Sequence, residues 1–138
     1  MTNRVGLVGW YWLPVVMYAW LIFTASSLPH PEELAPALFQ FASDKLLHAI
    51  EYGILAILCY RAFRHAAGPS AKGYALGLAI LTAAAYGVSD EIHQAFIPSR
   101  ESSGWDVLAD GVGAAIAACG WHWCWKVERI ARPLHDGS

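Results

Sequence analysis

The residues able to do chemistry gather in three short segments that lie far apart along the chain. In the first segment, Asp44 and His48 are four positions apart, and Tyr52 follows four positions later. Spacings of three and four place side chains on one face of a helix. A histidine held by a carboxylate can act as a general base because its ring titrates near neutral pH. We therefore interpret His48, oriented by Asp44, as a candidate catalytic base and Tyr52 as a candidate substrate-binding residue.

The other two segments supply further carboxylates, an amide and an arginine. Glu91 and Gln94 share one segment with Arg100, and Asp106 and Asp110 follow, again four positions apart. A carboxyl group that burial keeps protonated can act as a general acid, which makes Glu91 and Asp110 catalytic candidates together with Asp106. An arginine binds phosphate or carboxylate groups with two parallel hydrogen bonds. We assign Arg100 and Gln94 to substrate binding.

The same residues allow other interpretations. A divalent metal would take its ligands from Asp44, His48, Glu91 and Asp106, where oxygen ligands suit Mg²⁺ or Mn²⁺ and histidine favours Zn²⁺. We do not favour this alternative, and the cofactor stays unassigned. In a further alternative the cluster is non-catalytic, and either binds a ligand without turnover or only holds the helices together. The sequence has no P-loop, no HExxH motif and no nucleophile of the Ser-His-Asp type.

Composition places these residues in a membrane protein. Of 138 residues, 57% are hydrophobic and 14% are charged, whereas about 25% are charged in soluble domains. No Asp, Glu, Lys or Arg occurs from Val5 to Pro31, a longer stretch than the roughly 20 apolar residues that span a bilayer. The net charge of -2 lacks the basic excess of nucleic-acid-binding proteins, so we expect no nucleic-acid partner.

Four apolar stretches predict an all-α, polytopic membrane protein, a bundle of four transmembrane helices in a single domain. The predicted helices cover residues 7–28, 44–63, 73–96 and 105–127, and the polar residues 128–138 form a cytoplasmic tail. Ser43 and Ser103 are expected to cap the second and fourth helices. The first stretch has an alternative interpretation as a secretory signal peptide, although it is long for one.

Basic residues predict the orientation of the bundle. With four spans, one side holds seven of the nine Lys and Arg residues, and the other side holds only Lys45 and Arg100. Because cytoplasmic loops carry the positive excess, we expect both termini in the cytoplasm. The acidic segments then lie near the outer surface. An ionisable group within a bilayer is costly unless it faces protein or water.

This cost leads to three expectations about side-chain contacts. The first is that one outward-opening polar cavity contains Asp44, His48, Glu91, Arg100 and Asp106. The second is that Arg100 folds back onto carboxylates of the third or fourth helix. The third concerns Asp106 and Asp110, whose like charges repel at this spacing. Either one of them, the deeper Asp110, stays protonated, or a cation or Arg100 lies between them.

These motifs resemble those of VanZ-like membrane proteins. The segment 44–48 (D-K-L-L-H), followed by Tyr52, is similar to the D-K-x-x-H-x-x-x-Y signature of that family. The segment 90–100 (D-E-I-H-Q-A-F-I-P-S-R), followed by Asp106 and a glycine-rich helix, is similar to a second family motif. One departure is at Asp110, where the family usually has asparagine.

The resemblance implies an integral protein of the bacterial cell envelope, located in the cytoplasmic (inner) membrane. The founding member is associated with low-level resistance to the glycopeptide teicoplanin. The resemblance also implies a partner, namely a membrane lipid, a lipid-linked cell-envelope or peptidoglycan precursor, or a glycopeptide antibiotic. It does not decide whether the protein is an enzyme. The oligomeric state is not indicated by the sequence.

Overall fold

The computed structural model describes residues 4–30, 33, 36, 43–100 and 102–131. These residues form helices with no strand among them, which confirms the all-α prediction. The helices are α1 (Arg4–Ser26), α4 (Asp44–His65), α5 (Pro69–Gly73), α6 (Ala75–Gln94) and α7 (Gly104–Ala131). A short connection joins α6 to α7, and the turn that contains α5 joins α4 to α6.

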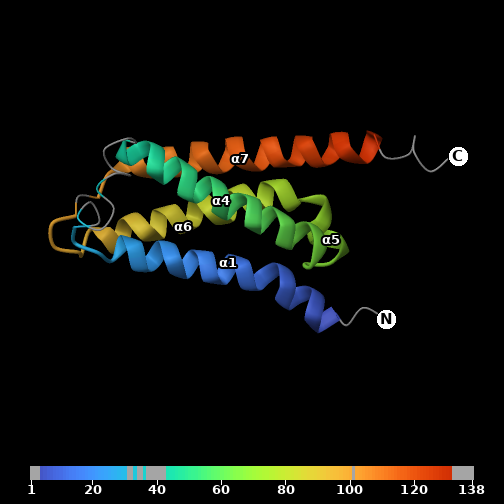
Figure 1. The fold of residues 1–138 in the computed structure, drawn as a ribbon, viewed down its shortest axis with the longest axis horizontal. Coiled ribbons are helices and arrows are strands. Elements are labelled where there is room, and N and C mark those ends of the chain that lie inside the picture. Colours follow the sequence, from blue (N-terminus) through green and yellow to red (C-terminus); the bar gives the residue numbers. More distant parts are fainter. Residues whose placement is uncertain (1–3, 31–32, 34–35, 37–42, 101, 132–138) are drawn as a thin grey trace, which may run out of the picture.

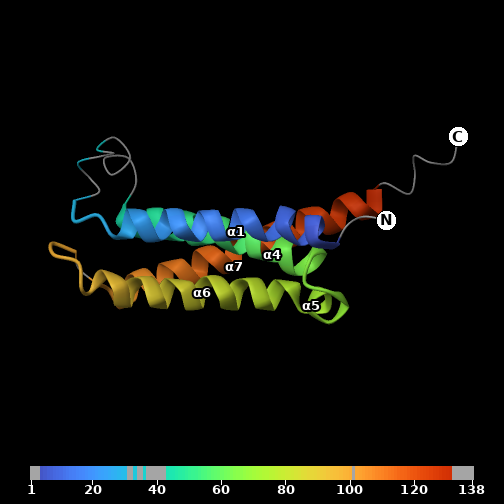
Figure 2. The same cartoon turned by 90° about the horizontal axis from the view of Figure 1, so that it is seen from below.

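The four long helices lie side by side and run the length of the molecule (Figure 1). Helix α4 is central and packs against α1, α6 and α7. Figure 2 shows α6 as a second layer beneath α1 and α4, with α7 crossing obliquely. The start of α1 and the end of α7 lie at the same end of the bundle (Figure 1). At the other end of the bundle, the first turns of α4 and α7 lie together with the last turns of α1 and α6.

Three helices are long and apolar enough to cross a membrane, namely α1 from Val5, α4 and α6. The protein is accordingly a membrane protein. Helix α7 is longer than these, but its glycines, tryptophans and His122 lower its hydropathy, and it does not satisfy the same criterion. The four-helix arrangement is present, while the fourth membrane span stays a prediction.

Helix boundaries follow the sequence with two corrections. The third predicted helix, from residue 73, is split: α5 begins at Pro69 after Gly68, whose φ of 89° suits glycine, and α6 starts only after Tyr74. Helix α7 continues to Ala131, so residues 128–131 are helical rather than part of a tail, and 132–138 lie outside the described residues. Both caps are confirmed, since each serine hydroxyl accepts a hydrogen bond from a nearby backbone N–H, at Leu46 and Trp105.

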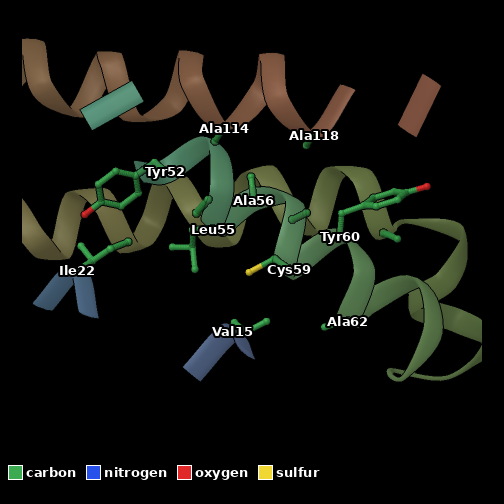
Figure 3. Packing of buried hydrophobic residues seen from close by; sticks show 13 residues of the cluster. Val15, Ile22, Tyr52, Leu55, Ala56, Cys59, Tyr60, Ala62, Ala114 and Ala118 are labelled. Carbon is green, nitrogen blue, oxygen red and sulfur yellow. The ribbon is translucent and has the colours of Figure 1, made fainter. Parts of the chain in front are cut away.

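Small residues let the helices approach closely. Ala114 and Ala118 of α7 point toward α4 and Ala56 lies between the helices (Figure 3). A Cβ atom added to Gly113 would collide with the backbone of Ala49, so α4 and α7 are nearly in backbone contact there. In lipid, helices gain no hydrophobic stabilisation from association, because the surrounding acyl chains are equally apolar. Close van der Waals packing of backbones stabilises the helix pair instead. Helices α4 and α7 therefore have little freedom to shift against each other.

Helix α1 is held mainly by polar and aromatic contacts along one side. The Tyr86 hydroxyl of α6 donates a hydrogen bond to the carbonyl of Ala19 over 2.7 Å. His93 of α6 lies 3.0 Å from the Ser27 hydroxyl through Nε2, and its ring packs on Phe23. Many large apolar side chains on the remaining surface of α1 are exposed, as expected for a helix that faces lipid.

Candidate functional site

All of the buried polar side chains among the described residues lie at one end of the bundle. Apart from Ser26 of α1, they come from the beginnings of α4 and α7 and the end of α6 (Figure 1). They are His48, Asp90, Glu91, Gln94, Asp106 and Asp110. Three segments that are distant in sequence are thus brought to the same depth, as the helix spacings predicted. We call this group of residues, with Asp44 and Lys45, the acidic-end cluster.

The core of the acidic-end cluster is a buried pair between α4 and α7. The Nδ1–H group of His48 donates a hydrogen bond to Asp110 Oδ1 over 3.0 Å. The two side chains are 8% and 0% exposed. The sequence suggested Asp44 as the residue that orients His48, and this was wrong: Asp44 is exposed, and Asp110 makes the contact. Since Nδ1 is bonded, Nε2 is the ring nitrogen left to accept a proton or bind a ligand.

Asp110 is packed so tightly that a glycine is required opposite it. A Cβ atom at Gly87 of α6 would lie 2.6 Å from Asp110 Oδ2. That oxygen is buried and has no hydrogen-bond partner among the described residues. The carboxylate is therefore bonded to α4 through one oxygen and pressed against the α6 backbone with the other. It connects three helices at one point.

Asp106 has a different cationic partner. Lys45 Nζ lies 3.0 Å from Asp106 Oδ1, and the lysine side chain is 56% exposed while that of the aspartate is 5% exposed. The alternative in which Arg100 lies between Asp106 and Asp110 is wrong, because each carboxylate pairs with its own residue of α4. The ammonium group of Lys45 thus reaches from α4 to α7. A protonated Asp110 stays a prediction.

One group of side chains has the composition of a metal site. Single ligand atoms from Asp44, His48 and Asp106 lie within 4.8 Å of one another. Asp110 behind His48 would orient the ring, as carboxylates do for metal-bound histidines. Glu91, the fourth expected ligand, does not belong to this group within the described residues. Lys45 would have to leave Asp106 before a cation could bind.

The end of α6 contributes a second set of buried polar side chains. Glu91 Oε2 accepts a hydrogen bond from the backbone N–H of Ser103 over 2.8 Å, so it fastens the connection that precedes α7. Glu91 Oε1 is buried and has no partner among the described residues. Gln94 donates to Asp90 over 2.9 Å, one turn away on the same helix. Gln94 is therefore occupied by Asp90, although we proposed it for substrate binding.

Arg100 and Tyr52 are half-buried or buried candidates, each with a side-chain nitrogen or oxygen atom that has no hydrogen-bond partner among the described residues. Arg100 is half-buried, its Nε atom is buried and unpaired, and no described carboxylate lies within ion-pair distance of it. The expected contact of Arg100 with carboxylates of α6 or α7 is therefore absent. Tyr52 is fully buried, and its hydroxyl group lies close to Asp90 without forming a hydrogen bond of standard geometry. Its ring stacks parallel to that of His48 at 6.4 Å.

Two residues of the acidic-end cluster were missing from the candidates chosen from the sequence. Asp90 is 5% exposed, and its position four residues before Gln94 was the signal that it shares the same helix face. Lys45 carries the only ammonium group that contacts a described carboxylate. Its position beside Asp44 gave no such signal, because adjacent residues point to different sides of a helix.

The acidic ends of α4, α6 and α7 are the segments in which the two sequence motifs occur, and the comparison with known families covers both. The model of the VanZ/LLP1 family matches residues 8–125. The chain belongs to the VanZ/LLP1 family. No curated protein and no solved structure matches it.

In this chain, several residues of the VanZ/LLP1 motifs make contacts between helices. In the first motif, Lys45 and His48 both reach from α4 to aspartates of α7. In the second motif, Glu91 fastens the connection to α7 and His93 fastens α1. The departure at Asp110 coincides with the most buried carboxylate of the described chain. The motifs thus join the four long helices at one end.

Proposed function

We propose that the acidic-end cluster is an outward-facing site that acts on the polar headgroup of an envelope lipid or of a lipid-linked peptidoglycan precursor. The observation that carries this proposal is the buried His48–Asp110 pair. A carboxylate that accepts the Nδ1–H bond fixes the tautomer in which Nε2 is basic. It also stabilises the imidazolium form once a proton has been taken up, which is the role such a pair plays in general-base catalysis.

Neighbouring residues fit a headgroup that carries phosphate or carboxylate. Arg100 has a buried nitrogen without a partner among the described residues, and Lys45 is exposed enough to turn from Asp106 toward a ligand. Both cations lie beside the connection to α7 or the first turn of α4. An arginine that is not already paired can offer its whole planar fork to a phosphate group. The cluster thus combines a base with groups that bind anions.

The proposed orientation has four spans with both termini in the cytoplasm and the acidic-end cluster at the outer surface of the inner membrane. It is supported by the basic residues that concentrate at the end of the bundle where α1 begins and α7 ends. Cysteines placed singly at Ser70 and Ser102 in a cysteine-free chain would test it. Labelling from outside the cell should reach Ser102 only, and labelling of Ser70 alone would reverse the orientation.

The activity is tested with purified protein and a bacterial lipid extract, following both turnover and retention of lipid. We expect His48→Ala to abolish turnover. A matched control is His122→Ala, because His122, which is half-buried, also bonds across two helices, to the Tyr60 hydroxyl at 2.8 Å, but near the opposite end. Equal loss in both variants would indicate damage to the bundle and would contradict a special role for His48.

A second candidate function is non-catalytic. The contacts of Lys45 with Asp106 and of Glu91 with Ser103 join helices and are satisfied without any ligand, which favours a structural or binding role. In that case the wild-type protein retains a lipid, or a glycopeptide such as teicoplanin, without converting it. Retention that depends on Arg100 but not on His48 would establish binding alone. If nothing is retained or converted, the cluster only holds the bundle together.

A further inference from the structure

The end of the bundle opposite the acidic-end cluster collects positive charge that pairs with no carboxylate of the described residues. In the last turns of α4 and α7 and in α5, the only described acidic residue is Glu128. No described carboxylate lies within ion-pair distance of the basic residues there. These basic residues are Arg61, Arg64, Lys72, Lys126 and Arg129. We call them the basic-end cluster.

The arginines of the basic-end cluster rest on aromatic rings instead of carboxylates. The guanidinium carbon of Arg64 lies 4.0 Å from the centre of the Trp125 ring, and that of Arg129 lies 4.9 Å from the same ring. Two like charges therefore share one indole. Arg61 lies 5.8 Å from the ring of Tyr11. A ring attracts a cation but carries no net charge, so an anion is still required to offset the repulsion.

Beside Arg61 lies a groove with apolar walls. It lies between α1 and α4, has a volume of about 430 Å³, and is lined by Gly6, Gly9, Trp10, Leu13, Pro14 and Arg61. This volume lies within the roughly 300–1,000 Å³ that is typical of ligand sites. A Cβ atom at Gly6 or Gly9 would have nothing within 4 Å, so the glycines leave this side of α1 open. Among the described residues, Arg61 is the only charged residue of the lining.

The walls of the groove are held by contacts between rings. Tyr11 of α1 stacks on His65 of α4 with ring centres 5.0 Å apart and an interplanar angle of 16°. Next to it, Trp12 packs edge-on against Phe63 at 5.2 Å. Both contacts fix the beginning of α1 against the end of α4. The groove is therefore a formed feature of this end of the bundle and does not depend on a ligand to create it.

We propose that Arg61 and Arg64 of the basic-end cluster, together with this groove, bind one anionic phospholipid of the surrounding leaflet. Its phosphate pairs with Arg61, Arg64 adds positive charge one turn along α4, and an acyl chain lies along Gly6, Gly9 and Leu13. The occupant is a lipid because a single cation borders an otherwise apolar groove on a helix that is apolar enough to span the membrane. Basic pockets between membrane helices bind phosphate headgroups in this way.

The purified full-length protein in a neutral detergent tests this proposal. The probes are phosphatidylglycerol, the zwitterionic phosphatidylethanolamine and inorganic phosphate, and the readouts are retained lipid by native mass spectrometry and the shift of the melting temperature. We expect phosphatidylglycerol to bind about tenfold more tightly than phosphatidylethanolamine, since the anionic headgroup meets two or more arginines. Inorganic phosphate should bind weakly, because it leaves the groove empty.

Two variants and one control separate the parts of the proposed site. Arg61→Gln removes the cation beside the groove and should weaken phosphatidylglycerol binding about fivefold. Gly9→Leu fills the groove at a position with free space, so it should fold and also lose lipid binding. The control, Lys126→Gln, removes one exposed charge of the same cluster that contacts no ring and should change little.

Three results would contradict the proposed lipid site. Equal loss in Arg61→Gln and Lys126→Gln would show general electrostatic attraction and overturn the specific site. Unchanged binding in Gly9→Leu would overturn the groove, and full competition by inorganic phosphate would show a site for free anions. The inference does not depend on the proposed function, because His48→Ala should retain phosphatidylglycerol like the wild type.

Discussion

The acidic-end and basic-end clusters lie at opposite ends of one helix bundle and accommodate charge differently. In the acidic-end cluster, four carboxylates are buried, and each contacts a named side chain or backbone group. In the basic-end cluster, the charged groups are half-buried or exposed, and its arginines lie against aromatic rings. Burial makes an individual partner indispensable, because an unpaired charge away from water is costly. Exposed cations can exchange one partner for another.

The largest expected effect tests whether His48 and Asp110 are coupled. His48→Ala leaves a fully buried carboxylate without its partner, which should lower the free energy of unfolding by about 3–5 kcal/mol. The double variant His48→Ala with Asp110→Ala should recover a large part of this loss, since no buried charge remains. Chemical unfolding of the four proteins in one detergent gives the coupling energy.

The same cycle has an informative control. Asp110→Asn keeps an oxygen that accepts the His48 N–H bond but removes the charge. We expect a smaller loss of stability than in Asp110→Ala. If the effects of the two alanine variants simply add, His48 and Asp110 act independently and the contrast between the two clusters fails.

An intermediate effect is expected from the glycine that faces Asp110. Gly87→Ala places a methyl group 2.6 Å from Asp110 Oδ2 and should destabilise the protein by about 1–3 kcal/mol. Gly77→Ala on the same helix has nothing within 4 Å of its Cβ atom. It should be neutral or stabilising, because alanine favours helices over glycine by about 0.5–1 kcal/mol. Equal melting temperatures for the two variants would show that α6 does not press on the carboxylate.

The smallest effect is expected in the basic-end cluster. Trp125→Leu removes the ring beneath Arg64 and Arg129 and should reduce the free energy of unfolding by roughly 0.5–1 kcal/mol, as for exposed cation–π contacts. Trp123→Leu serves as the control, because Trp123 is 67% exposed and stacks with none of the described arginines. If Trp125→Leu lowered the free energy of unfolding as much as His48→Ala does, the two clusters would contribute equally to stability and the contrast between them would fail.

Local features of this fold could be predicted from the sequence. Apolar stretches located the long helices, Ser43 and Ser103 marked two helix starts, and spacings of four residues placed His48, Asp106 and Asp110 toward a common end. All of these follow from the periodicity of a single helix or from its capping. The break between α5 and α6 at Tyr74 was not predicted. Tyrosine is neither glycine nor proline, so it gives no local signal that a helix ends.

Partnerships between helices could not be predicted in the same way. Whether His48 meets Asp44, Asp106 or Asp110 depends on how far α4 and α7 slide along each other. That register is set by the close approach of Gly113 to Ala49, which a single sequence does not reveal. The position of Arg100 likewise depends on the path of the connection between α6 and α7. Contacts within a helix are encoded locally, whereas contacts between helices require the assembled bundle.

The loose attachment of α1 has a consequence for how the protein is made. In its most apolar window only 11% of α1 is buried, compared with 44% of α4, although α1 precedes the other helices in the chain. The segment that leaves the ribosome first is thus the one that gains least from its neighbours. We expect α1 to enter the bilayer as an independent span, to meet His65 and Phe63 of α4 first, and to be held completely only when Tyr86 and His93 of α6 have been synthesised. Docking of α1 would then be completed later than its own insertion.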